Sequence, residues 1–337
     1  MVGIIAIEYA LPKKVLSNEE LAKFYKNWTA EKIKNKTGIS TRHVTTETET
    51  AADLGIIAAE KLIAKNIIPK EEIDFVLCVT QSPDYKLPTT ACIIQDRLGL
   101  SKKTGAFDIN LGCSGYIYGL AVAKSLVETW IANNVLLITA ETYSKYINLL
   151  DKSTRTIFGD GAAATLIGHG GMEIGSFDLG TDGSGKDFLI IPTGGARNAC
   201  TPETAIEKET DGNVRSEDNL FMSGANIFEF TIREVPTSVK RIMKKEGLKK
   251  DDIGLYVFHQ ANQFMLDFLV KLMKVDKEKF YMNFADTGNT VSASIPIALK
   301  RAMDEGVVKS NQTILLSGFG VGLSWGSTII RTGEFVL

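Results

Sequence analysis

The chain has 337 residues, of which 44% are hydrophobic and 23% are charged, and its formal net charge at pH 7 is −2. This length exceeds what one hydrophobic core usually holds, so we expect two domains or one duplicated unit. The near-neutral charge argues against a nucleic-acid partner. No stretch is apolar for long enough to span a bilayer, and residues 1–15 lack the basic region of a signal peptide, so we predict a cytoplasmic protein without a membrane partner.

Strands and helices are predicted to alternate along the first half. The predicted strands are 2–9, 75–80, 135–140 and 165–167, and the predicted helices are 21–28, 29–36, 50–67, 89–98 and 116–133. Because 75–80 and 135–140 are continuously apolar, they indicate a parallel sheet buried on both faces. The segment 193–218 is rich in Gly, Thr, Glu and Asn, and it is predicted to be a long loop or an insertion.

The second half repeats this order, which predicts a duplicated α/β unit with two pseudo-symmetric halves, 1–170 and 171–337. Its predicted elements are helix 235–246, strand 255–258, helix 293–302 and strand 313–316. The turn 284–292 precedes a helix as the turn 107–115 does in the first half. Cys113 and Asn289 therefore occupy equivalent positions, and we expect the site to lie between the halves.

Cys113 stands between a predicted strand and the helix 116–133. The unpaired N–H groups and the positive dipole at a helix N-terminus favour an anion, so we expect the pKa of this thiol to fall below its ordinary value. Gly112 and Gly115 would let backbone or substrate approach the sulfur. Cys113 is therefore a candidate nucleophile, although a cysteine in an apolar run can also be a small buried hydrophobic residue. The four cysteines show no metal-binding spacing, so no metal site is expected.

His259 follows the predicted strand 255–258, at the edge where open α/β sheets place ligands. Taken alone, it could be a structural core residue, and Asn289, which follows Gly288, could be a turn residue. The equivalence of Asn289 with Cys113 favours a common site for all three.

With these residues and this element order, the chain resembles the β-ketoacyl-acyl-carrier-protein synthase III family of thiolase-like condensing enzymes. The motifs that carry the resemblance are TGIxxRH at 37–43, LGCSG at 111–115, FGDGA at 158–162, HQAN at 259–262, GNTxxAS at 288–294 and FGxGxxWGS at 319–327. The family implies a duplicated five-layered αβαβα fold. The nucleophilic cysteine would lie in the thiolase-like half 1–170, and the histidine and asparagine would lie in the half 171–337.

The resemblance also implies a reaction. Cys113 would accept an acyl group from a thioester primer, and His259 and Asn289 would bind malonyl-acyl-carrier protein while it loses CO2 and condenses to a 3-oxoacyl-acyl-carrier protein. The N–H groups of Cys113 and Gly322 would form the oxyanion hole. The implied partners are an acyl carrier protein, the acyl thioester and a second copy of the chain in a homodimer. No metal or cofactor is implied.

The expected binding sites for the primer depart from the family pattern. Lys32 and Lys36 stand where the family often has a tryptophan and an arginine that flank the adenine of coenzyme A, and Lys152 replaces another arginine. Since lysine cannot stack or bind phosphate through two parallel hydrogen bonds as arginine does, priming from coenzyme A is put in doubt.

Two more expected substrate-binding positions also differ. Leu87 stands where the family often sends a phenylalanine across the dimer interface into the partner's acyl pocket, and Phe264 replaces a basic residue near HQAN. The remaining residues expected to bind substrate are Phe158, Met222 and Asn262. These differences suggest a specialised acyl or secondary pathway rather than initiation of fatty-acid synthesis.

Other functions stay open on the sequence alone. The same acyl-cysteine could pass its acyl group to an alcohol or amine without decarboxylation. A papain-like protease also uses Cys, His and Asn in this order, but the local sequence around its cysteine is absent here. A noncatalytic partner subunit would be expected to lack the nucleophile, which this chain retains.

Overall fold

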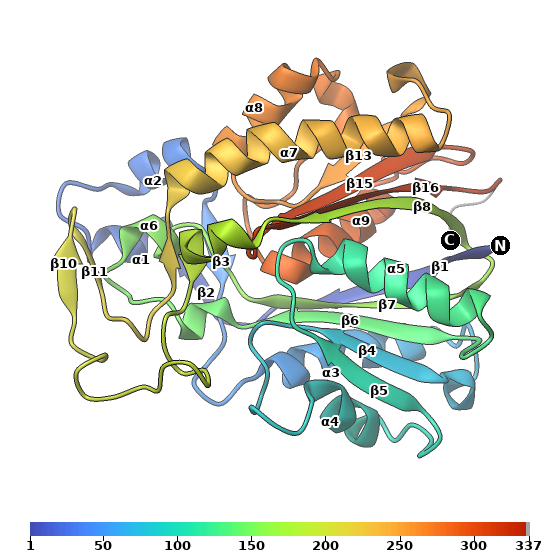
Figure 1. The fold of residues 1–337 in the computed structure, drawn as a ribbon, viewed down its shortest axis with the longest axis horizontal. Coiled ribbons are helices and arrows are strands. Elements are labelled where there is room, and N and C mark those ends of the chain that lie inside the picture. Colours follow the sequence, from blue (N-terminus) through green and yellow to red (C-terminus); the bar gives the residue numbers. More distant parts are fainter. Residues whose placement is uncertain (335–337) are drawn as a thin grey trace.

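The computed structural model describes residues 1–334 and is built on a ten-stranded mixed sheet with two five-stranded halves (Figure 1). The strand order is β5-β4-β6-β7-β1 in the first half and β8-β16-β15-β13-β14 in the second. The halves meet where β1 (Val2–Ala10) pairs with β8 (Met172–Thr181) over two residue pairs. The second half therefore repeats the first in reverse order, as the predicted duplication requires.

The inner strands of both halves are buried, because helices cover both faces of the sheet. The first half also contains β4 (Phe75–Val79), β5 (Gly105–Ile109), β6 (Val135–Glu141) and β7 (Gly161–His169). The second half contains β13 (Leu255–Phe258), β14 (Phe280–Tyr281), β15 (Thr313–Gly320) and β16 (Ser324–Arg331). Strand β4 runs parallel to β5 and β6, and β13 runs parallel to β14 and β15, so the carboxyl ends of these strands meet at one edge.

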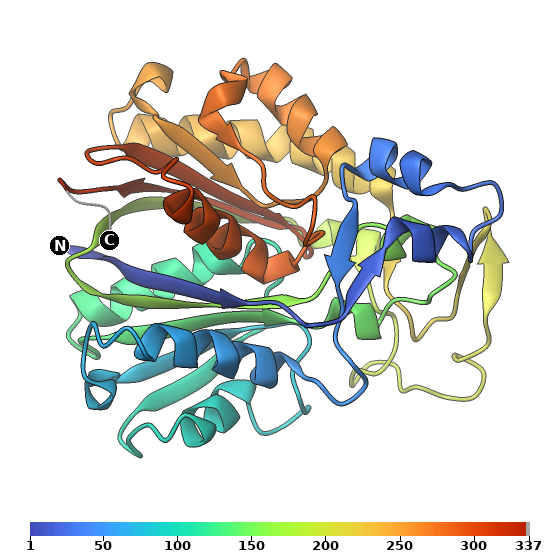
Figure 2. The ribbon, with the colours of Figure 1, turned by 180° about the vertical axis from the view of Figure 1, so that it is seen from behind.

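Helices form three layers around the two half-sheets, which confirms the five-layered αβαβα fold (Figures 1 and 2). The middle layer consists of α5 (Gly115–Glu128) and α9 (Ser294–Asp304). The outer layers are α3 (Ala51–Ile63) with α4 (Thr90–Arg97), and α7 (Gly224–Lys245) with α8 (Gln263–Met273). Each layer packs on its own cluster of buried apolar side chains. The two helices of the middle layer begin at the turns that carry Cys113 and Asn289.

Four predicted helices differ in length from those in the structure. The helices predicted over 50–67 and 116–133 end earlier, at Ile63 and Glu128. The helix predicted over 21–28 is only α1 (Asn18–Ala22), which starts at a capping box between Ser17 and Glu20. The helix predicted over 235–246 is the 22-residue α7, which begins at Gly224. Pro236 lies inside this helix.

The segment 193–218 is a mostly irregular excursion that carries a short hairpin of β10 (Lys208–Thr210) and β11 (Asn213–Arg215). Its base is closed by pairing between β9 (Leu189–Ile190) and β12 (Phe221–Met222). The hairpin lies beside α6 (Lys152–Arg155), at the same end of the molecule as α1 and α2 (Ala30–Thr37) (Figure 1). The remaining short strands, β2 (Val15–Ser17) and β3 (Thr41–His43), pair with each other.

None of the helices in residues 1–334 is long and apolar enough to cross a membrane. The division into domains 1–170 and 171–337 stays a prediction, although the turn between β7 and β8 falls at that point of the chain.

Candidate active site

Cys113 lies in a tight turn between β5 and α5, with 5% of its surface exposed. The turn is closed by a hydrogen bond from the Gly115 N–H to the Gly112 carbonyl, at 2.7 Å. Side chains at either glycine would collide with their neighbours: a Cβ at Gly112 would lie 2.4 Å from the Gln81 side chain, and one at Gly115 would lie 2.4 Å from Val79. The glycines therefore let the Gln81 and Val79 side chains pack closely on this turn. The expected approach of substrate to the sulfur past these glycines stays a prediction.

The predicted lowering of the pKa of Cys113 is wrong for this structure. Burial raises the pKa of the thiol to about 12, and the nearby Glu141 carboxyl acts in the same direction. Hydrogen bonds with the backbone of Val321 and of Cys113 itself act against the rise. The sulfur is thus held as a thiol, because its burial outweighs the favourable position at the helix N-terminus.

The backbone groups around the sulfur also bear on the expected oxyanion hole. A hydrogen bond that lowers the pKa of a thiol must donate to the sulfur, so the groups at Val321 and Cys113 are N–H groups. Gly320, the residue before Val321, lines the same cavity, whereas Gly322 does not. The structure therefore places the backbone of Val321, one residue before the predicted Gly322, beside the nucleophile.

His259 follows β13 and is 2% exposed. Its Nδ1 lies 2.7 Å from the Ser294 hydroxyl, which also accepts the Gln260 N–H at 3.4 Å. Ser294 can therefore donate its own proton to Nδ1, which leaves the proton of the neutral ring on Nε2. Burial lowers the pKa of His259 to about 3, while a hydrogen bond with the Val291 backbone acts in the opposite direction. The ring is neutral at physiological pH.

Asn289 is fixed on both sides by backbone hydrogen bonds to the neighbouring segment. Its N–H donates to the Ile157 carbonyl at 2.9 Å, and its carbonyl accepts the Gly159 N–H at 3.0 Å. The side-chain Oδ1 accepts the Val291 N–H at 2.9 Å, which fixes the amide so that Nδ2 faces His259. Gly288, at φ 68°, provides the left-handed turn that leads into this arrangement.

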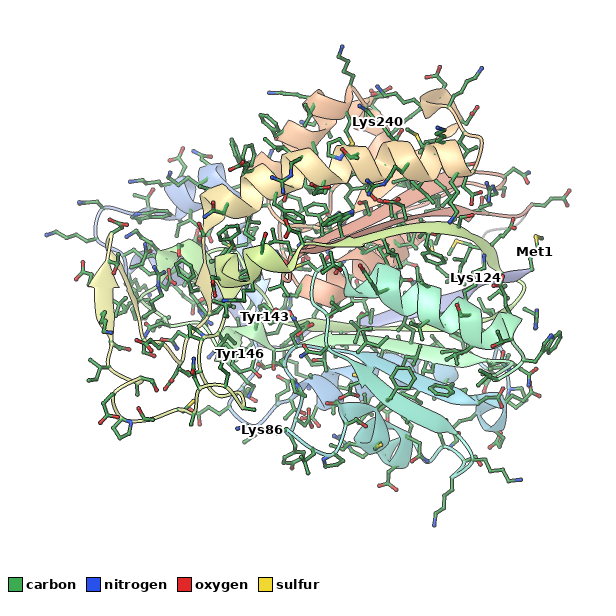
Figure 3. The ribbon with its side chains drawn as sticks, in the orientation of Figure 1. Met1, Lys86, Lys124, Tyr143, Tyr146 and Lys240 are labelled. Atoms are coloured by element: carbon green, nitrogen blue, oxygen red, sulfur yellow. The ribbon has the colours of Figure 1, made fainter. Side chains whose placement is uncertain are left out.

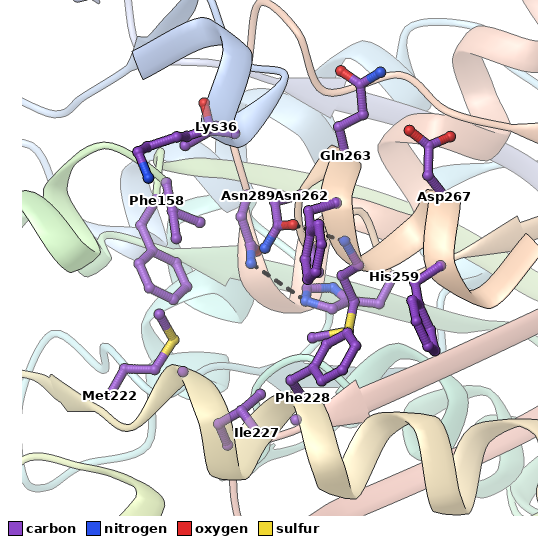
Figure 4. A pocket seen from close by; sticks show the side chains of 18 of the residues that line it. Lys36, Phe158, Met222, Ile227, Phe228, His259, Asn262, Gln263, Asp267 and Asn289 are labelled. Carbon is purple, nitrogen blue, oxygen red and sulfur yellow. Dashed lines mark hydrogen bonds between the residues drawn. The ribbon is translucent and has the colours of Figure 1, made fainter. Parts of the chain in front are cut away.

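The three predicted catalytic residues meet in one cavity of about 950 Å³ (Figure 4). Asn289 Nδ2 lies 3.4 Å from His259 Nε2, and both groups face the space that Cys113 also lines. The cavity floor is apolar. Buried side chains around Cys113 include Tyr143, Ile147, Phe158, Leu189, Leu220 and Val291.

Several other predicted substrate-binding residues also line this cavity, namely Lys36, Phe158, Met222, Asn262 and Phe264. Asn262 caps α8, because its side chain accepts the Met265 N–H at 2.9 Å. Phe264 is 63% exposed. Its ring centroid lies 5.4 Å from that of Phe228, and the Phe268 ring is 4.9 Å from Phe228, so aromatic side chains border the cavity on this side.

Among the described residues, Lys32, Leu87 and Lys152 do not line the cavity. The Lys32 ammonium donates to the Asn27 carbonyl at 3.0 Å and lies 5.4 Å from the centre of the Trp28 ring. Lys36 lies 5.8 Å from the same ring. Trp28 thus lies just before α2, four residues ahead of Lys32, and its ring contacts the ammonium groups of both lysines.

Lys152 points into the hairpin of segment 193–218, where its ammonium donates to the carbonyls of Asp211 and Gly212. This arrangement differs from the expected role in substrate binding, because the ammonium group donates its hydrogen bonds to the hairpin turn. Leu87 is 83% exposed, in the loop between β4 and α4.

Sequence reasoning missed cavity residues that come from the first half of α7, such as Ile227 and Phe228 (Figure 4). They were missed because that part of α7 was not predicted to be helical. The signal was present in the four-residue spacing of Ile227, Thr231, Val235 and Val239, the last three of which are buried.

Comparisons with known proteins agree with this geometry. Two family models match, described as 3-oxoacyl-[acyl-carrier-protein (ACP)] synthase III over residues 107–183 and as its C-terminal part over residues 243–332. A curated beta-ketoacyl-[acyl-carrier-protein] synthase III from Caldanaerobacter subterraneus subsp. tengcongensis is 37% identical, over 98% of this chain and 97% of the relative. Its counterpart from Clostridioides difficile is 38% identical over 98% of both chains.

A solved structure of a 3-oxoacyl-(acyl-carrier-protein) synthase III matches the fold with a TM-score of 0.95 and 46% sequence identity, over 99% of each chain. The relatives are thus similar over nearly the whole chain, including both turns that carry the site. The chain belongs to the β-ketoacyl-[acyl-carrier-protein] synthase III family.

Proposed function

We propose that this chain catalyses the decarboxylative condensation of an acyl thioester with malonyl-acyl-carrier protein, which yields a 3-oxoacyl-acyl-carrier protein and CO2. Family membership supports the reaction. The observation that carries it is the geometry of the cavity, where the amide of Asn289 and the neutral ring of His259 lie 3.4 Å apart beside the Cys113 thiol.

In the first step Cys113 takes the acyl group. Its sulfur attacks the carbonyl carbon of the primer thioester, and the tetrahedral oxyanion accepts hydrogen bonds from the N–H groups of Cys113 and Val321. Each such donor is worth roughly 3 to 4 kcal/mol in the transition state. The C–S bond of the primer then breaks, and the departing thiol carries away the proton that Cys113 loses. Because the pKa of Cys113 is about 12, this proton must leave as attack proceeds.

In the second step malonyl thioester enters the acylated site. Breakage of its C–CO2 bond leaves the electron pair on an enolate, whose oxygen accepts hydrogen bonds from His259 Nε2–H and Asn289 Nδ2–H. A neutral histidine suits this role, since it stabilises the negative oxygen without giving up its proton. The enolate carbon attacks the acyl-cysteine carbonyl, a C–C bond forms, and Cys113 leaves as a thiolate that takes up a proton.

We also propose that no metal or redox cofactor takes part, since a thiol and hydrogen-bond donors suffice for both steps. The acyl carrier protein would deliver the malonyl group past Phe264 and Phe268, which border the cavity. A cytoplasmic location follows from the same proposal, because the substrates are soluble thioesters.

A homodimer is the proposed assembly. Strand β5 is an edge of the ten-stranded sheet, and Phe107 on it is 37% exposed. Leu87 and Tyr85 in the adjoining loop are 83% and 63% exposed. An uncovered apolar sheet edge of this kind favours pairing with a second copy of the chain.

The test is intact mass spectrometry of the wild type and of Cys113→Ala after incubation with a panel of acyl-coenzyme A and acyl-carrier-protein thioesters. Malonyl-acyl-carrier protein is then added to any acylated form, and CO2 release is measured. The proposal expects an acyl adduct on the wild type alone, which disappears with release of CO2. Loss of the adduct to an alcohol or amine without CO2 would instead show the simpler acyl transfer. The primer that loads best also distinguishes fatty-acid initiation from a specialised pathway.

A further inference from the structure

Beneath the catalytic turns lies a buried carboxyl group that the proposed chemistry does not use. Glu141, the last residue of β6, has no exposed surface and receives hydrogen bonds from both halves of the protein. Its Oε1 accepts the Ser292 hydroxyl at 2.8 Å, and its Oε2 accepts the Ser82 hydroxyl at 2.9 Å. The Gln81 N–H lies 3.2 and 3.1 Å from the two oxygens. A buried carboxyl with this many donors is held in a single position.

On one side, Glu141 reaches the turn that carries Asn289. Val291 has a φ of 54°, a left-handed conformation that β-branched residues strongly resist. This conformation persists only if its neighbours hold it. Asn289 Oδ1 accepts the Val291 N–H at 2.9 Å, and on the other side the Ser292 hydroxyl is bound to Glu141. Val291 therefore lies directly between the Asn289 amide and the serine that is bound to Glu141.

On its other side, Glu141 reaches the turn of the nucleophile. It binds the backbone of Gln81, whose side chain lies against Gly112, the residue before Cys113. The side-chain Oε1 of Gln81 in turn accepts the Tyr143 hydroxyl at 2.5 Å. Tyr143 is 4% exposed, and its ring centroid lies 6.4 Å from that of Tyr146; both residues are labelled in Figure 3. One carboxyl group thus links the turn of the nucleophile in the first half to the turn of the enolate donors in the second.

We propose that Glu141 is a positioning residue, which holds the Val291–Ser292 turn and thereby keeps the donors of Asn289 and His259 in register with Cys113. The proposal rests on the proposed function, because it concerns the malonyl step of that reaction. The two serine hydroxyls that bind Glu141 have different roles in this proposal. The Ser292 bond supports decarboxylation, whereas the Ser82 bond belongs to the half that carries the nucleophile.

The experiment compares Ser292→Ala with Ser82→Ala, which remove one hydroxyl each from the same carboxyl group. Both serines are buried, at 1% and 3% exposure, so the two substitutions are matched in size and burial. Ser82 also accepts the Thr142 N–H at 2.8 Å, so Ser82→Ala removes one more hydrogen bond than Ser292→Ala does from the half that carries the nucleophile. Each variant is acylated on Cys113, and both half-reactions are followed in single turnovers: adduct formation by intact mass, then CO2 release on addition of malonyl-acyl-carrier protein. Thermal unfolding is measured for every variant, so that loss of folding is separated from loss of position.

Ser292→Ala is expected to slow CO2 release at saturating malonyl substrate by about tenfold, the size of effect that a small misplacement of catalytic groups produces, with acylation within about twofold of wild type. Ser82→Ala is expected to release CO2 within about twofold of the wild-type rate. Glu141→Gln, which keeps the volume but turns an amide toward hydroxyl donors, is expected to slow both half-reactions. If it does not fold, the serine pair still decides the question.

Two results would overturn the inference while leaving the function intact. One is a wild-type rate of CO2 release in Ser292→Ala, and the other is an equal loss of CO2 release in both serine variants. If the wild type itself neither acylates nor releases CO2, the proposed function fails instead, so the two failures are distinguishable.

Discussion

Gly320 offers a direct test of how closely the nucleophile is packed. It ends β15 and lines the cavity next to Cys113. A Cβ at this position would lie 2.7 Å from the Cys113 Cβ and 2.8 Å from its sulfur. Gly320 is not among the residues with positive φ, so the backbone accepts alanine and the only obstacle to Gly320→Ala is steric.

The expected size of the effect follows from these distances. Nonbonded carbon atoms are most stable about 3.5 to 4.0 Å apart, so Gly320→Ala forces a shift of about 1 Å on groups in a buried turn. Overpacking of this kind costs about 1 to 3 kcal/mol of stability. Because the sulfur itself must move, acylation of Cys113 is expected to slow by about 10²-fold, the loss typical of a 1 Å misplacement.

The assay is the rate at which the acyl adduct appears on Cys113, measured by intact mass, together with the unfolding temperature. Gly183→Ala is the matched control, because a Cβ at Gly183 meets nothing within 4 Å and this glycine lies outside the cavity. Gly183→Ala should acylate at the wild-type rate. A folded Gly320→Ala that acylates as fast as the control would refute the packing argument.

Three further predictions concern the donors and the hairpin. Asn289→Asp keeps the oxygen that accepts the Val291 N–H but replaces the Nδ2 donor, so CO2 release should fall by about 10²- to 10³-fold while the adduct on Cys113 still forms; unchanged CO2 release would contradict the role of the amide. The folded-state pKa of His259 is depressed from 6.5 to about 3, so its stabilising contribution is present above pH 6.5 and is lost as the pH falls toward 3. Chemical denaturation should therefore show wild type losing stability relative to His259→Gln across that range, by on the order of 4 to 5 kcal/mol at most, and parallel curves would disprove the neutral buried ring. Arg215→Ala removes an ion pair at 3.1 Å from Asp151, whose side chain is 1% exposed, and should destabilise the protein by about 1 to 3 kcal/mol and speed proteolysis within 193–218. Lys208→Ala is the control, because it removes an exposed ion pair with Glu217 at 3.5 Å and should lower the free energy of unfolding by less than about 1 kcal/mol. Equal losses of stability in the two variants would show that burial of the Asp151 pair is unimportant.

The amino-acid sequence by itself was enough to predict the duplicated fold and the meeting of Cys113, His259 and Asn289. Repetition of the same element order places equivalent strand-to-helix turns at one edge of the two half-sheets, and the residues at those turns must then face one another. The predicted strands and helices were found for the same reason, because their apolar periodicity reflects which face is buried. The prediction left out β8, α8, β16 and the first part of α7.

Tertiary structure alone decided the properties that depend on contacts between distant residues. The pKa of Cys113 rises because the fold buries the sulfur near Glu141, an effect that outweighs the local helix N-terminus visible in the sequence. The ammonium of Lys152 donates to the carbonyl of Asp211, 59 residues later, a contact that no local sequence pattern indicated. The backbone of Val321, 208 residues after Cys113, acts on the thiol through a hydrogen bond that only the folded chain brings into place. Burial and long-range hydrogen bonds have no local pattern, and a single sequence therefore cannot reveal them.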